Sequence, residues 1–210
     1  IQQDITAIKT GTPSKHTLAE WQTQLEAKAA HNVGYGQLVE WLAVMQAEVA
    51  ASTPVAAMHA IRLYRKLSAY ATWTTFEYAL ILPVLPYLAF AQSQHVFEQY
   101  LDFKHVRLPN VVRENLEVLY LGLLASAIND ADPSAVKQVL TWIKTHQGVD
   151  IRPRFKLYQR LADALLTHSP ATLEAVLAAV DTVLGKHAEP ERQELAALWH
   201  RAWTLLASAD

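Results

Sequence analysis

Residues 66–92 read KLSAYATWTTFEYALILPVLPYLAFAQ, and the fourteen residues from 78 to 91 carry no charge. A helix that crosses a bilayer needs about 20 apolar residues, whereas runs of about 10–14 are more typical of buried helices. Pro83 and Pro86 each lack a backbone N–H donor and tend to end or kink a helix. We therefore predict a buried helical hairpin and no membrane span. Its two helices are expected over 72–82 and 86–104.

The rest of the chain has the composition of a helical globular protein. Hydrophobic residues make up 51% of the chain and charged residues 18%, which favours a packed core over disorder. Only six glycines occur, and no Asn-Gly or Asp-Gly hairpin turn and no useful alternating strand pattern is found. We predict an all-α fold. Further helices are expected over 1–10, 14–30, 35–51, 54–71, 109–130, 133–146, 153–168, 170–184 and 190–208.

Three of these helix starts combine a capping residue with a proline. The pairs are Asp132–Pro133, Ser169–Pro170 and Glu189–Pro190. A cap side chain accepts a hydrogen bond from a backbone N–H of the first turn. Proline at the first helical position loses no bond, because that N–H has no partner within the helix. The apolar residues that follow recur every three or four positions, which gives each helix one apolar face.

Short connections between the expected helices indicate antiparallel hairpins. Successive hairpins are spaced by about 36–43 residues, close to the value of about 34 in tetratricopeptide arrays. They begin near Gly36, Trp73, Pro109, Arg152 and Glu189. We predict a single domain over 1–210, built as a tetratricopeptide-like superhelix of antiparallel helical hairpins. Such arrays present a concave surface to extended peptides or helices.

The sequence contains no motif of a known catalytic or metal site. It has no cysteine, no glycine-rich phosphate loop and no HExxH pair. Its nine histidines are dispersed, and no two of them are three or four residues apart. The net charge is −2 with scattered basic residues, which does not favour nucleic-acid binding by this chain. We predict a cytoplasmic protein that is not an enzyme and binds no metal or cofactor.

Polar residues of one expected helix are candidates for ligand binding. Asn115, Gly122 and Asn129 are spaced by seven residues, so they lie roughly on one face, with Ser126 near them. An asparagine side chain offers both a donor and an acceptor and can hold a peptide backbone. The alternative is that both asparagines are ordinary helix-end residues.

The densest basic segment is IRPRFKLYQR at 151–160. Arg152, Arg154 or Arg160 could anchor a carboxylate of a bound peptide, or the segment could be a solvated helix start. The six tryptophans are expected in the core, or along a binding groove where they are exposed.

The segment YRKLSAYATWTTFEYALILPVLPYL at 64–88 resembles the Rgg/MutR family of Gram-positive transcriptional regulators. In that family a Trp, an aromatic residue and a Glu open a helix of the C-terminal domain, and the matching residues are Trp73, Phe76 and Glu77. VVRENLEVLYLGLLASAIND and RFKLYQRLADALL are similar to the family's next inner helices, with Tyr158 in a common aromatic position. The resemblance covers most of 50–210, in pattern more than in identity.

The resemblance implies a cytoplasmic receptor for a short apolar signalling peptide. The family joins an N-terminal helix-turn-helix to a dimerising, peptide-sensing domain. This chain would be only the second part, a homodimer that reaches DNA through a domain preceding Ile1. Trp199 and Trp203 are expected to contribute to the dimer interface. The alternative is a stand-alone helical-repeat adaptor for a protein partner.

The resemblance also implies a peptide groove, although Pro83, Pro86 and Gly122 stand where family members often carry polar side chains. The expected lining residues are Phe76, Pro83, Pro86, Asn115, Gly122, Ser126 and Asn129, with Arg154 or Tyr158 at the edge.

Overall fold

The computed structural model describes residues 15–30, 32–104, 109–146, 153–172, 174–176, 178 and 189–209. These residues form helices, turns and short connections, with no strand among them, so the predicted all-α class is confirmed. The helix predicted over 1–10 and most of that over 170–184 lie outside the described residues. The chain divides into two compact units, Ile1–Leu88 and Ala89–Asp210.

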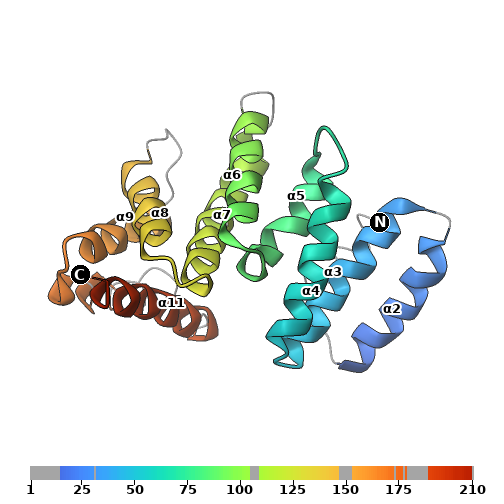
Figure 1. Ribbon diagram of the computed structural model, residues 1–210, viewed down its shortest axis with the longest axis horizontal. Helices are drawn as coiled ribbons and strands as arrows, with labels where there is room; N and C mark the ends of the chain where they lie inside the picture. The colour runs from blue at the N-terminus through green and yellow to red at the C-terminus, as the bar shows by residue number, and fades with distance from the viewer. Residues whose placement is uncertain are drawn as a thin grey trace. The chain divides into compact units, whose positions relative to one another are not determined.

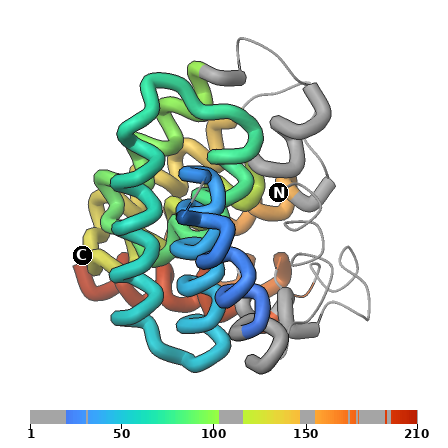
Figure 2. The backbone as a smooth tube through the Cα atoms, turned by 90° about the vertical axis from the view of Figure 1, so that its right-hand side faces the viewer, coloured from blue at the N-terminus to red at the C-terminus, as the bar shows by residue number. Residues whose placement is uncertain are grey.

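The first unit is built from successive helices that pack against their chain neighbours. Its elements are α2 (Lys15–Ala29), α3 (Val33–Val49), α4 (Thr53–Leu67), α5 (Thr75–Ile81) and the 3-10 helix η1 (Leu82–Tyr87). Helix α3 packs between α2 and α4, and α3 and α4 run side by side (Figure 1, Figure 2). Helix α5 contacts both α3 and α4, and η1 contacts α4 and α5. Completely buried leucines from these elements form the core, among them Leu38, Leu42, Leu63, Leu67, Leu80 and Leu85.

Half of the apolar segment over 78–91 is buried, namely Tyr78, Leu80, Ile81, Leu82, Val84, Leu85 and Leu88. Its helices differ from the prediction. Helix α5 is shorter than 72–82, and η1 replaces the expected bend. Pro83 and Pro86 lack the N–H groups that an α-helix would use there, and η1 accommodates both. Leu88 is extended, with φ −94° and ψ 154°, so the next helix begins only at Phe90. None of the helices in the described ranges is long and apolar enough to cross a membrane.

The Trp-aromatic-Glu motif joins α4 to α5. The indole N–H of Trp73 donates to the carbonyl of Leu67, the last residue of α4, at 2.9 Å. Thr74 is the N-cap of α5, and the Glu77 carboxylate accepts from the Thr74 backbone N–H at 2.7 Å. This reciprocal capping box satisfies N–H groups that the helix itself leaves unpaired. The motif therefore ends one helix and starts the next.

Helix α3 begins two residues earlier than predicted. The side chain of Asn32 accepts a hydrogen bond from the backbone N–H of Gly34 at 2.9 Å, which caps the helix. Gly34 and Gly36 lie in its first turn.

Among the described residues of the second unit, successive helices pack side by side and a C-terminal helix packs across three of them. The described elements of this unit are α6 (Phe90–Lys104), α7 (Pro109–Asn129), α8 (Pro133–Thr145), α9 (Pro153–Leu166) and α11 (Glu189–Ala207). Each of α6 to α9 packs against the next, and α11 contacts α7, α8 and α9 (Figure 1). A plain stack of hairpins has no such crossing helix, so the finer prediction of a tetratricopeptide-like superhelix stays a prediction.

The structure bears on two local predictions in this unit. The Asp132 carboxylate accepts from the N–H groups of Ser134 and Ala135 at 2.9 and 3.0 Å, which confirms the predicted cap of α8. Trp199 is completely buried, with its ring centroid 6.4 Å from that of Tyr158. The second unit itself covers the Trp199 side chain, and the expectation that the C-terminal helix contributes to a dimer interface stays a prediction.

Aromatic side chains link α6, α7, α8, α9 and α11 of the second unit. Phe97 of α6 stacks on Trp142 of α8, with centroids 5.1 Å apart and planes inclined by 9°. Tyr120 of α7 contacts both Phe97 and Phe155, and its hydroxyl is 3.0 Å from Nδ1 of His146. Burial raises the pKa of Tyr120 to about 12, so its hydroxyl stays protonated at neutral pH.

Candidate functional site

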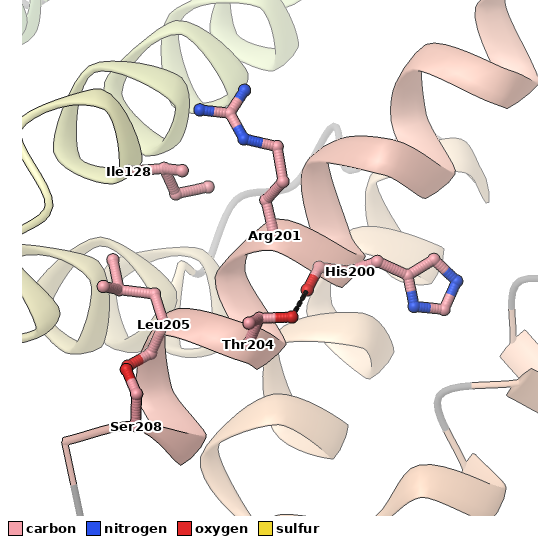
Figure 3. Close-up of a pocket in the computed structure, with 6 residues that line it drawn as sticks. All are labelled: Ile128, His200, Arg201, Thr204, Leu205 and Ser208. Atoms are coloured by element: carbon pink, nitrogen blue, oxygen red, sulfur yellow. Dashed lines mark hydrogen bonds between the residues drawn. The ribbon is translucent and has the colours of Figure 1, made fainter.

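A pocket of about 420 Å³ lies in the second unit, between the end of α7 and the second half of α11 (Figure 3). This volume falls within the range of about 300–1,000 Å³ that is typical of ligand sites, but the pocket is shallow and open to solvent. The residues that line the pocket are Ile128, His200, Arg201, Thr204, Leu205 and Ser208. The pocket forms because α11 packs against the earlier helices α7, α8 and α9 and lies next to the C-terminal end of α7.

The floor of the pocket is apolar. Ile128 of α7 is 7% exposed and Leu205 of α11 is half-buried. In Figure 3 both side chains lie on the left of the pocket. The ring of His200 points away from them, and its Nε2 is 3.8 Å from a carboxylate oxygen of Glu174. The pocket can therefore take an apolar group against Ile128 and Leu205, without contact from the imidazole.

The rim of the pocket carries one cation and two hydroxyls. Arg201 donates from Nη2 to the side-chain carbonyl of Asn129 at 2.6 Å. A guanidinium has five N–H donors, so this bond leaves most of them for another acceptor. The hydroxyls of Thr204 and Ser208 donate to carbonyls of α11, at 3.0 and 2.8 Å, and keep only acceptor capacity. Arg201 is thus the donor that a carboxylate or carbonyl group would meet.

The predicted groove residues of the first unit lie on two adjacent elements. Phe76 is in the first turn of α5, and Pro83 and Pro86 are in η1. All three side chains are half-buried.

The predicted groove residues of the second unit differ in exposure. Asn129 is exposed at the end of α7 and binds Arg201 at the pocket rim. Gly122 and Ser126 are buried, and the Ser126 hydroxyl donates to the carbonyl of Leu123 at 2.9 Å. Tyr158 is 1% exposed and packs among the aromatic residues. These three buried residues pack the unit, so they are covered in this conformation.

The side chains of two other predicted residues lie outside the described part of the chain. They are Asn115 on α7 and Arg154 on α9.

No pattern in the sequence indicated Ile128, Arg201 and Leu205 as pocket residues. They come from helices that are separated by about seventy residues, and Arg201 and Asn129 are 72 positions apart. Periodicity predicts which face of a helix is apolar, but it does not predict which distant helix that face meets.

A second polar cluster, which the sequence did not predict, lies between α3 and α4 in the first unit. The carboxylate of Glu40 is 2.8 Å from His59 Nδ1 and 2.8 Å from Lys66 Nζ, and Lys66 also donates to the carbonyl of Gly36 at 3.2 Å. Burial acts to raise the pKa of Glu40, but the hydrogen bonds and charges of His59 and Lys66 outweigh it, and the pKa is lowered. The cluster ties α3 to α4.

Within the described ranges, no group of three or more His, Asp or Glu side chains is placed to hold a metal ion. Comparison of the chain with protein-family models, with curated proteins and with solved structures gives no match.

Proposed function

We propose that the chain is the ligand-sensing and dimerisation domain of a transcriptional regulator, and that it binds a short apolar signalling peptide. In this proposal it is a cytoplasmic homodimer on a tetratricopeptide-like scaffold, and a separate N-terminal domain binds DNA. Support comes from helices that pack mainly on their chain neighbours and from the resemblance at Trp73, Phe76 and Glu77.

The observation that carries the proposal is the composition of the pocket between α7 and α11. Its floor is formed by Ile128 and Leu205, and its rim presents the guanidinium of Arg201. A peptide can place one apolar side chain on this floor and a carboxylate or backbone carbonyl on the guanidinium. Asn129, which the sequence indicated as a peptide-binding residue, holds Arg201 at the rim.

The test uses purified protein and a library of synthetic heptapeptides with apolar side chains and a C-terminal carboxylate, screened by native mass spectrometry. For the tightest-binding peptide, Arg201→Gln is expected to raise the dissociation constant about tenfold, because a hydrogen bond to a charged group contributes about 1.5–3 kcal/mol. Leu205→Ala should also weaken binding, because it removes part of the apolar floor. Isothermal titration calorimetry measures both variants.

The matched control is Lys156→Gln, which removes an exposed cation from α9. It should leave the dissociation constant unchanged. Equal losses in Lys156→Gln and Arg201→Gln, or no binding by any heptapeptide, would show that the proposal is wrong.

A stand-alone adaptor for a protein partner is the second candidate function. It is favoured by Val55 and Met58 on α4, which are each 42% exposed. The two candidates predict different coding sequences before the codon of Ile1, since only the regulator requires a helix-turn-helix segment there.

A further inference from the structure

Helix α4 presents an exposed stripe that is apolar at one end and basic at the other. The stripe consists of Val55, Met58, Arg62 and Arg65. Val55 and Met58 are among the most exposed large hydrophobic side chains of the described residues. The opposite face of α4 is fully buried through Ala56, Ala60, Leu63 and Leu67. The stripe is therefore the solvent face of a helix that is already anchored in the first unit.

The charge on this face is not neutralised within the described structure. Helix α4 contains no Asp or Glu. Glu40 of α3 contacts α4, but its carboxylate binds His59 and Lys66. Neither Arg62 nor Arg65 makes an ion pair or side-chain hydrogen bond in the described part of the chain. Two guanidiniums thus remain beside two exposed apolar side chains.

The spacing of the stripe matches the contact line of a packed helix. Its residues are separated by three, four and three positions, which places them along one side of α4. At 1.5 Å per residue the stripe is about 15 Å long, which corresponds to about three helical turns. Ridges of this spacing are the ones that a second helix packs against.

We propose that the α4 stripe docks an acidic amphipathic helix of a partner protein. Apolar side chains of that helix lie against Val55 and Met58, and its carboxylates pair with Arg62 and Arg65. Charge complementarity selects this occupant, since an Arg guanidinium binds carboxylates in a fixed, bidentate geometry. The stripe belongs to the first unit, so the proposal does not rest on the peptide pocket.

Nucleic acid and anionic membranes fit the stripe less well. Tight binding to DNA uses about 6–10 phosphate contacts, and this face offers two unpaired guanidiniums. A membrane-binding helix inserts a wide apolar face, whereas the apolar face of α4 is buried in the protein.

The probe is a synthetic, fluorescein-labelled helical peptide of about 14 residues, long enough to cover the stripe. It carries leucines opposite Val55 and Met58 and glutamates opposite Arg62 and Arg65, and a second peptide has glutamine in place of each glutamate. Fluorescence anisotropy with the full chain is expected to show at least about fivefold tighter binding of the glutamate peptide, consistent with two exposed ion pairs. Arg62→Glu should remove most of this preference, and Met58→Ala should weaken binding of both peptides.

Two matched controls test whether the losses are local. Lys156→Glu reverses an exposed charge on α9, and Val118→Ala truncates a 43% exposed side chain on α7, so neither should change the affinity. Circular dichroism checks that each variant keeps its helix content. If Arg62→Glu loses helicity, Arg65→Gln tests the charge contribution in its place. Equal affinity for both peptides, or equal losses in Arg62→Glu and Lys156→Glu, would overturn the proposal. Tighter Arg62-dependent binding to a 20-base-pair duplex or to phosphatidylserine vesicles would also overturn it.

Discussion

Glu40 of α3 binds two residues of α4, His59 and Lys66, which lie on different turns of that helix. Its side chain is 13% exposed, and its carboxylate accepts from both His59 and Lys66 at 2.8 Å. Burial of a carboxylate raises its pKa, but here the two partners more than compensate, and the pKa of Glu40 is lowered. A carboxylate with a lowered pKa stabilises the folded state at pH values above its unfolded pKa. That stabilisation is lost as the pH falls through the folded pKa.

We predict that Glu40→Gln lowers the free energy of unfolding of the first unit by about 1 kcal/mol at pH 7, because charge-assisted hydrogen bonds are replaced by neutral ones. The difference between wild type and variant should shrink as the pH falls through the lowered pKa of Glu40, because the wild-type carboxyl then becomes protonated. Urea unfolding followed by circular dichroism at a series of pH values measures both quantities.

Glu48→Gln is the matched control, since Glu48 lies exposed at the end of the same helix. It should have little effect at any pH. A loss in Glu40→Gln that stayed constant down to pH 2 would contradict the assigned role of the carboxylate.

At the scale of elements, the sequence predicted the helices well where the helix ends have their own chemical signals. The cap at Asp132 and the proline that follows it predicted the start of α8 to the residue. The prediction of α3 was late by two residues because the capping role of Asn32 was not recognised. The segment with Pro83 and Pro86 was predicted as a bend, but sequence alone did not indicate that a 3-10 helix would span both prolines.

The site was less predictable than the helices. Of the predicted groove residues, Asn129 binds Arg201, which lines the pocket, while Ser126 and Tyr158 are buried in the packing of the second unit. The apolar period of α7 is compatible with burial against another helix or with a groove, because both require apolar side chains. Only the position of α11 distinguishes these two possibilities at Ile128.

The connection between α4 and α5 depends on the indole N–H of Trp73, which binds the carbonyl of Leu67. We predict that Trp73→Phe destabilises the protein by about 1–3 kcal/mol, because the buried carbonyl loses its side-chain donor and the smaller ring leaves unfilled space. Thermal unfolding monitored by circular dichroism measures the loss.

Trp203→Phe is the corresponding control, since the half-buried indole of Trp203 makes no hydrogen bond to other described residues. Its effect should be clearly smaller. If the two variants were equally destabilised, the hydrogen bond of Trp73 would not be what secures the connection.

At the scale of the whole molecule, the two units carry surfaces of different chemistry. The first unit presents the basic and apolar stripe of α4, and the second unit contains the pocket between α7 and α11. The stripe is exposed along a helix and suits a partner helix, whereas the pocket is a shallow, open depression that a short peptide could cover. We therefore expect two ligands that bind independently.

The central claim is that a short apolar peptide binds between α7 and α11. Hydrogen–deuterium exchange of the full chain, with and without a saturating amount of the tightest-binding heptapeptide, tests this claim most directly. We predict slower amide exchange in the last turn of α7, over 126–129, and in the second half of α11 and the residue after it, over 200–208. Protection confined to the segment over 75–87, or no change in exchange anywhere, would contradict the claim.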